Sequence, residues 1–179
     1  MEPQLSIIVP VYDPGEYLPR ALDRIAGQTR GDFECILVDD GSTDGSAAVC
    51  DEYAAKDGRF RVIHQKNAGA SAARNAGIGA ARAPWLLFAD ADDVLADDAV
   101  ETLLARQLAE PEVFVVFAFT EGLDLLGVER RQPPEKRYHA RDLGRMYAET
   151  PLAAPWGKLF NAALVTAAGL RFDTAMRCY

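Results

Sequence analysis

Histidine, cysteine and basic side chains are scarce in this sequence of 179 residues. Two histidines are too few for a histidine-rich metal site, and three cysteines form an odd number without metal-ligand spacing. The 19 Lys and Arg side chains are outnumbered by 27 Asp and Glu, which leaves a net charge of -8. Nucleic acid and anionic membrane surfaces are polyanions, so this charge disfavours both as main partners. It does not exclude a small anionic ligand whose charge is balanced locally.

Long hydrophobic runs are also missing. No uninterrupted apolar segment approaches the ~18 residues of a membrane span, and residues 1–4 lack the basic and hydrophobic regions of a signal peptide. Cys35 and Cys50 lie in apolar segments, as expected of reduced thiols. We therefore expect a chain without a membrane span that is located in the cytoplasm. The inner face of the membrane is included in this expected location. The length and the 49% hydrophobic content predict one domain with a sizeable core.

Strand and helix patterns alternate along the first 110 residues. Short apolar segments rich in β-branched residues predict buried strands at 5–12, 33–39, 60–64 and 85–89. Between them, Leu18, Leu22 and Ile25 recur at helical spacing. A second helix is expected after N-cap candidates at 42–44, and two more helices are expected at 70–82 and at 97–108. This alternation implies an α/β fold with a mainly parallel sheet flanked by helices in a single domain.

Beyond residue 110 the pattern is less regular. We expect one more strand at 113–120, a charged loop or edge hairpin at 122–141, and helices at 141–149 and 156–168.

Polar or acidic residues follow each of the four buried strands. In open parallel sheets, ligands bind at the carboxyl ends of the strands. One edge of the sheet should therefore collect the segments 10–13, 39–42, 66–69 and 90–93.

The most informative of these segments is Asp90-Ala91-Asp92-Asp93. Carboxylates that end a buried strand repel one another and need a cation or protonation to be tolerated. Mg²⁺ or Mn²⁺, held by one or two carboxylates together with ligand phosphates and water, meets that need. We favour this interpretation for Asp90 and Asp92. The alternative, a solvated loop before an acidic helical turn, is preferred for Asp97 and Asp98.

Asp39 and Asp40 end another buried strand, and two interpretations stay open for them. The pair could form only a turn and a helix cap. Alternatively, one carboxylate accepts from a base N–H or a ribose hydroxyl while the other holds the turn.

Small residues open the helix expected after the third strand. Asn67, Gly69 and the residues that follow would let a ligand approach the backbone at a helix N-terminus, where anionic groups are favoured. Arg74 and Asn75 would lie one turn into this helix. A helix packed tightly on the sheet, with a surface arginine, is the alternative.

Taken in order, these segments resemble the family-2 glycosyltransferases of GT-A type. The resemblance is carried by SIIVPVY at 6–12, VDDGSTD at 38–44, NAGASAARNAG at 67–77 and FADADD at 88–93. It continues more thinly through WGKLF at 156–160 and LRF at 170–172. The resemblance implies a GT-A, Rossmann-like fold, with a donor-binding half at 1–110 and a partial acceptor-side region at 111–179.

The resemblance also implies an activity and its cofactor. A sugar would pass from a nucleotide-diphosphate sugar, usually a UDP-sugar, to an acceptor hydroxyl with inversion at the anomeric carbon, and Mn²⁺ or Mg²⁺ would be required. The acceptor would be a glycan, a lipid-linked or a protein acceptor, as in enzymes that build surface polysaccharides.

Carried over by position, Pro10, Val11 and Tyr12 would hold the nucleobase together with Asp39 or Asp40. Arg74, with Asn75, would close over the base or the phosphates.

The remaining positions concern the metal and the acceptor. Asp90 would meet the ribose or the metal, Asp92 would bind the metal, and Asp93 competes for that role. Trp156 and Lys158 are acceptor-side candidates, against the alternative of a core tryptophan and a surface lysine. One departure is Asp13, where the family commonly has Asn.

The resemblance places the catalytic base, an Asp of an acidic pair, beyond Tyr179, so we expect a truncated domain whose donor site is present. A donor-binding fragment without turnover is therefore one alternative. A sugar nucleotidyltransferase is another, although it should carry a Gly-rich basic loop where this sequence has residues 12–15. A receiver domain would need its acidic pair after the first strand, and none is there.

Overall fold

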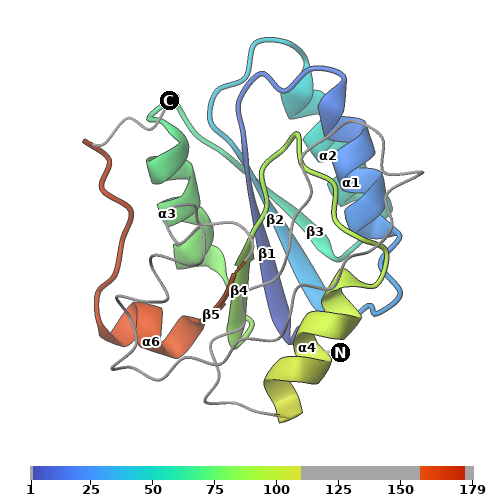
Figure 1. The fold of residues 1–179 in the computed structure, drawn as a ribbon. Helices are drawn as coiled ribbons and strands as arrows, with labels where there is room; N and C mark the ends of the chain where they lie inside the picture. Colours follow the sequence, from blue (N-terminus) through green and yellow to red (C-terminus); the bar gives the residue numbers. More distant parts are fainter. Residues whose placement is uncertain (1, 110–157, 176–179) are drawn as a thin grey trace, which may run out of the picture.

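The computed structural model describes residues 2–109 and 158–175. Helices and strands alternate in the order β1 (Leu5–Val11), α1 (Tyr17–Ala26), β2 (Phe33–Asp39), α2 (Ser46–Lys56), β3 (Phe60–His64), α3 (Ala70–Ala80), β4 (Trp85–Phe88), α4 (Ala99–Ala109), β5 (Leu159–Asn161) and α6 (Ala162–Ala167). The described strands form one sheet in the order β3-β2-β1-β4-β5 (Figure 1).

The sheet is mainly parallel, as the sequence predicts. β1 lies at its centre and pairs in parallel with β2 and with β4, and β3 pairs in parallel with β2. Among the described strands, only β5 is antiparallel, beside β4. The chain runs outward from β1 to β3 and then returns to β4 on the other side of β1. The strand order therefore reverses between β1 and β4, the place where such sheets bind ligands.

Alternate side chains of each buried strand face different layers of helices. One core cluster joins Ile7 and Val9 of β1 to apolar residues of α1, α2 and α4. On the other face, Ile8 and Phe88 pack with residues of α3 and α6. Burial on both faces explains why the strands read as nearly continuous apolar runs.

Helix α3 approaches β1 closely at Gly77. A Cβ at this position would collide with Cγ2 of Ile8, so only glycine allows this helix–strand distance. The N-terminus of α3 is thereby held directly beside the end of the central strand.

Two expected elements need correction. Residues 156–168 do not form one helix: Leu159 and Phe160 pair with β4, and the helix starts at Ala162, where Asn161 Oδ1 caps the N–H of Leu164 at 3.0 Å. A long-range strand partner overrides the local helical pattern here. Helix α2 begins at Ser46 after Gly45, later than the caps expected at 42–44, although Oδ1 of Asp44 does accept from the N–H of Ser46 at 2.9 Å. The elements expected at 113–120, 122–141 and 141–149 lie outside the described residues.

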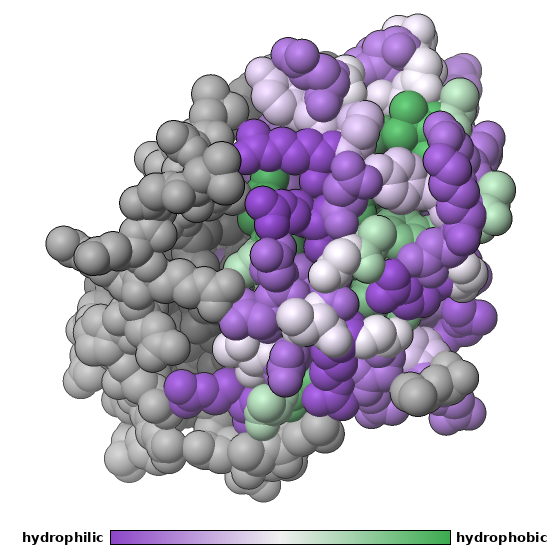
Figure 2. Space-filling model, turned by 90° about the vertical axis from the view of Figure 1, so that its right-hand side faces the viewer, coloured by the Kyte–Doolittle hydropathy of each residue, from purple (hydrophilic) through white to green (hydrophobic). Residues whose placement is uncertain are grey.

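The surface on the side of α1 and α2 is mainly hydrophilic, and apolar residues appear there only in small separate groups (Figure 2). Within the described residues, no helix is both long and apolar enough to cross a bilayer. Cys35 and Cys50 are buried and free, as predicted.

Candidate functional site

A cleft of about 630 Å³ opens at the carboxyl ends of β1, β2 and β4. Its lining consists of Pro10, Val11, Tyr12, Asp13, Pro14, Tyr17, Asp40, Asn67, Gly69, Ala70, Ala73, Arg74, Asp90, Ala91 and Asp92. The volume is in the range of small-molecule sites. Most of the residues predicted for the donor site from the sequence therefore lie around one cleft, whereas Asp39, Asn75 and Asp93 are not among its lining residues.

Asp40 shapes the floor of the cleft through the loop that follows β3. Its Oδ1 accepts from the backbone N–H of Ala68 at 2.9 Å and from Gln65 Nε2 at 2.7 Å, and its Oδ2 accepts from the N–H of Gly69 at 2.7 Å. This buried carboxylate fixes the turn into α3. A carboxylate oxygen can accept more than one hydrogen bond, so Oδ2 retains acceptor capacity for a ligand N–H.

Asp39 lies behind the cleft and holds the β2–α2 turn. Its Oδ1 accepts from the N–H of Ser42 at 3.0 Å, and its Oδ2 lies 2.9 Å from Nδ1 of His64. Burial alone would raise the pKa of Asp39, but the hydrogen bonds from His64 and Ser42 outweigh burial and lower it. Of the two carboxylates, Asp40 is therefore the one at the cleft.

Arg74 and Asp90 form an ion pair across the cleft. Nη2 of Arg74 donates to Oδ1 of Asp90 at 2.8 Å, and both side chains are largely buried. The guanidinium carbon lies 5.6 Å from the centre of the Phe172 ring. The surface-arginine alternative is therefore wrong, since only 15% of the Arg74 side chain is exposed and it is paired with Asp90.

The carboxylates after β4 crowd one another. Partial burial, and next the negative charges of Asp90 and Asp92, raise the pKa of Asp93. Among the described residues, no three Asp, Glu, His or Cys side chains converge as a ready-made metal cage. Mg²⁺ and Mn²⁺ need only one or two carboxylates when phosphates and water complete the shell. Asp92, exposed at the cleft beside the Arg74–Asp90 pair, fits that limited role.

Asp13 ties together the two loops above β1 and β2. Its backbone has φ = 46°, a left-handed conformation that Asp and Asn tolerate better than most residues. Its Oδ1 accepts from the N–H groups of Thr43 at 2.5 Å and Asp44 at 3.2 Å. In return, Asp44 Oδ2 accepts from the N–H of Gly15 at 2.7 Å. We call these four residues the loop clasp; it supports the Tyr12 side of the cleft.

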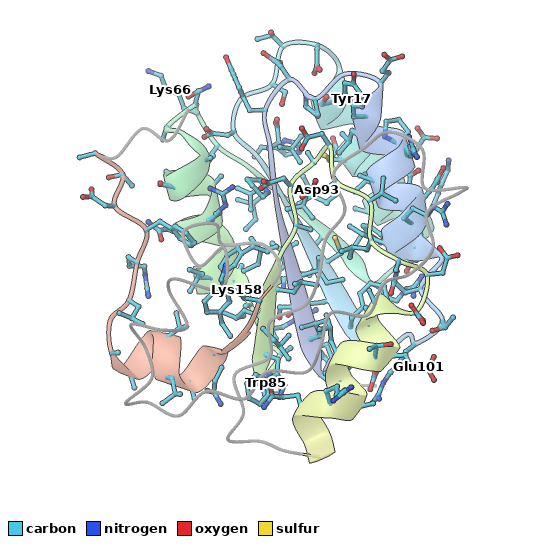
Figure 3. The ribbon with its side chains drawn as sticks, in the orientation of Figure 1. Tyr17, Lys66, Trp85, Asp93, Glu101 and Lys158 are labelled. Atoms are coloured by element: carbon cyan, nitrogen blue, oxygen red, sulfur yellow. The ribbon has the colours of Figure 1, made fainter. Side chains whose placement is uncertain are left out.

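Two further predicted positions lie away from the cleft. Asn75 bonds to the backbone of Phe172. Lys158 precedes β5 and is 3% exposed, so the surface-lysine alternative is wrong, and burial lowers its pKa. Figure 3 shows it between the upper rim, marked by Lys66 and Tyr17, and the lower end with Trp85. Trp156 lies outside the described residues.

Sequence reasoning missed Tyr17 and assigned no role at the site to Phe172. Tyr17 begins α1, lines the cleft and is 47% exposed. An aromatic residue next to the buried stripe that starts at Leu18 was the available signal. Phe172 contacts Arg74 only through tertiary structure: the LRF segment at 170–172 carries part of the resemblance, but nothing local in it predicts this contact.

A second hollow, of about 540 Å³, lies at the amino-terminal ends of β1 and β4 and is lined by Glu2, Pro3, Gln4, Arg82 and Pro84. Arg82 is already paired at 2.8 Å with buried Glu34, which also accepts from Ser6 and Arg61. This end of the sheet uses its charges to hold the fold together. We therefore place the functional site at the other end.

Solved structures share this fold. A Staphylococcus aureus TarS structure (residues 1–349) in complex with UDP superposes with a TM-score of 0.77 at 22% identity, over 98% of this chain and 51% of that one. The mannosyltransferase PcManGT from Pyrobaculum calidifontis, in complex with GDP-Man and Mn²⁺, gives a TM-score of 0.68 at 20% identity, over 97% and 48% of the two chains. The layers formed by the five described strands and their helices thus have the GT-A fold.

Curated relatives are glycosyltransferases by name. The putative glycosyltransferase EpsH of Bacillus subtilis is 33% identical over 178 residues, 95% of this chain and 50% of the relative. Glycosyltransferase GlyA of Streptococcus pneumoniae is 35% identical over 97% of this chain and 26% of the relative. The chain thus spans half or less of the length of these relatives.

The family model described as glycosyl transferase family 2 matches residues 6–166, which include β1 and its loop, the Asp40 turn, the start of α3 and the carboxylates after β4. With that match covering most of its length and the GT-A sheet beneath its cleft, this chain belongs to glycosyl transferase family 2.

Proposed function

We propose that this chain forms the donor-binding region of an inverting, divalent-metal-dependent glycosyltransferase that uses a UDP-sugar. The observation that carries the proposal is the Arg74–Asp90 pair beside exposed Asp92, at the point where the strand order reverses. A guanidinium and a carboxylate set side by side suit a metal-bound diphosphate, because one charge binds its oxygens and the other its cation. The TarS structures with UDP and UDP-GlcNAc support the choice of donor.

The nucleobase would lie between the Tyr12 side of the cleft and Asp40. Tyr12 and Tyr17 are half-exposed aromatic side chains at this rim, and each has a face on which a base can stack. The remaining lone pair of Asp40 Oδ2 would accept from a base N–H.

The diphosphate would lie between Arg74 and the carboxylates after β4. Asp92, with Asp90 or Asp93 as neighbour, would hold Mn²⁺ or Mg²⁺, which neutralises the charge of the departing nucleoside diphosphate when bound. Arg74 would donate to the phosphate oxygens that gain charge as the glycosidic bond breaks. An acceptor hydroxyl would attack from the opposite face of the sugar while a carboxylate on the acceptor side, acting as general base, removes its proton. The acceptor is expected to be a glycan, lipid-linked or protein hydroxyl.

Calorimetric titration of UDP into the chain, first with Mn²⁺ and then with EDTA, tests the proposal. We expect binding that EDTA abolishes. Asp92→Asn should weaken UDP binding in Mn²⁺ by about tenfold or more, the effect of removing a charge-assisted contact worth roughly 1.5–3 kcal/mol. Asp97→Asn is the matched control, because it removes the same charge from a side chain paired with Arg24 outside the cleft. Equal UDP affinities for wild type and Asp92→Asn would contradict the metal assignment.

A further inference from the structure

Asn75 of α3 holds the segment after α6 through two hydrogen bonds. Asn75 Nδ2 donates to the carbonyl oxygen of Phe172 at 2.9 Å, and the N–H of Phe172 donates to Asn75 Oδ1 at 2.8 Å. The side-chain amide of Asn75 thus bonds to both the N–H and the carbonyl oxygen of Phe172, a residue 97 positions later in the sequence. Figure 1 shows this segment running along the outer side of α3 toward the end that carries the cleft.

The ring of Phe172 is fixed on two sides. It meets the ring of Phe88 edge-on, with centroids 5.2 Å apart, and the guanidinium carbon of Arg74 lies 5.6 Å from its centre. A cation at this distance from an aromatic face is attracted to it. The hydrogen bonds of Asn75 therefore fix the position of the Phe172 ring, and the ring in turn contacts the guanidinium of Arg74.

Arg74 depends on this support. Its Nη2 bonds to Asp90, but its Nε is buried and has no hydrogen-bond acceptor within the described part of the chain. A buried N–H without an acceptor costs free energy, so the conformation of Arg74 has to be stabilised by its other contacts. Among these are the Asp90 carboxylate and the Phe172 face.

We propose that Phe172, oriented by Asn75, is a positioning residue that holds the Arg74 guanidinium in line with the diphosphate of the nucleotide. This inference rests on the proposed donor site and deepens it. On this proposal Asn75 does not close over the ligand, as the resemblance implied. It acts on Arg74 indirectly, by holding Phe172. Preorganising the guanidinium lowers the ordering cost when phosphate binds, so the effect falls on diphosphate affinity rather than on the nucleobase.

Phe160 provides a matched control. Its ring also packs edge-on against Phe88, with centroids 5.6 Å apart, so Phe160→Leu and Phe172→Leu each remove one aromatic contact with the same partner. Of the two rings, only that of Phe172 is paired with Arg74. A purely structural role would make the two variants behave alike.

The experiment compares UDP with uridine by calorimetry in Mn²⁺, for wild type, Phe172→Leu, Phe160→Leu and Phe172→Tyr. We expect Phe172→Leu to weaken UDP binding about fivefold, in keeping with the loss of a cation–π contact, and to leave uridine binding unchanged. Phe160→Leu should keep the wild-type ratio of the two affinities. Phe172→Tyr keeps an aromatic face and should restore the ratio.

If Phe172→Leu does not fold, Asn75→Ala provides the same comparison, since it releases the Phe172 backbone while retaining the ring. Wild-type binding with an unchanged ratio in the Phe172 or Asn75 variant would overturn this inference and leave the donor site standing. Equal loss in Phe160→Leu and Phe172→Leu would also overturn it. Absence of UDP binding by the wild type would overturn both proposals.

Discussion

At the residue scale, His64 links the end of β3 to two carboxylates. Its Nδ1 lies 2.9 Å from Oδ2 of Asp39 and its Nε2 lies 3.0 Å from Oδ1 of Asp51. The hydrogen bond with Asp39, and next the one with Asp51, raise the pKa of His64. The imidazolium therefore stabilises the folded chain, and through Asp39 it also supports the Ser42 turn behind the cleft.

This raised pKa predicts a pH-dependent contribution to stability. Because the folded pKa exceeds the unfolded value near ~6.5, the contribution is complete below about pH 6.5 and disappears as pH rises through the folded pKa. His64 is half exposed, so solvent screening limits the contribution to about 0.5 kcal/mol. Urea unfolding at pH 5.5 and pH 8.5 should show a larger destabilisation by His64→Gln at the lower pH. The same difference at both pH values would contradict this account.

The type and order of the site residues could be predicted from sequence, but their individual tasks could not. Asp39 and Asp40 are expected together at a strand end, because the buried strand before them stops where two adjacent carboxylates begin. Which of them faces the cleft depends on the backbone N–H groups of the loop at 65–69, and these come near only in the folded sheet. Asn75 is placed by Phe172, far away in sequence.

At the scale of elements, the loop clasp joins the connection β1–α1 to the connection β2–α2. We expect Asp13→Ala to cost about 1 kcal/mol of unfolding free energy, as for the loss of ordinary hydrogen bonds, and to weaken UDP binding because the Tyr12 rim loses its support. Asp13→Asn keeps an acceptor oxygen for Thr43 and Asp44 and should remain close to wild type in both measurements. Thermal unfolding and calorimetry test this. If Asp13→Asn were as damaging as Asp13→Ala, the charge rather than the acceptor geometry would be responsible.

Elements differ in how well the local pattern predicts them. The strands at 33–39 and 60–64 match their expected bounds, because burial within the sheet requires short β-branched and apolar runs ended by polar residues. The helix expected at 156–168 is wrong at its beginning, because residues 159–161 pair with β4 as a strand. Three residues are too few to show a strand period, and the pairing partner lies more than 70 positions earlier.

At the scale of the whole molecule, the sheet combines a rigid centre with less firmly held elements near its end. β1 is covered by helices on both faces and has parallel partners on both sides, and its residues are almost entirely buried. β5 has three residues, pairs with β4 and continues into α6, whose Leu164 is largely exposed. The cleft that we propose as the donor site opens from the rigid centre. Residues 170–172, which include the Phe172 that contacts Arg74, follow the less buried β5 and α6.

This asymmetry predicts the order in which the molecule opens. Amide hydrogens exchange through local openings where few apolar contacts hold a segment, and only through global unfolding where many do. Native-state hydrogen exchange should therefore give β1 and β2 amides opening free energies near the global value, and β5 and α6 amides clearly lower ones. UDP with Mn²⁺ should slow exchange in residues 170–172 as well as at the start of α3, since Arg74 and Phe172 are coupled through one contact. Equal protection of β5 and β1 would refute the proposed asymmetry, and slowing confined to α3 would separate the Phe172 segment from the donor site.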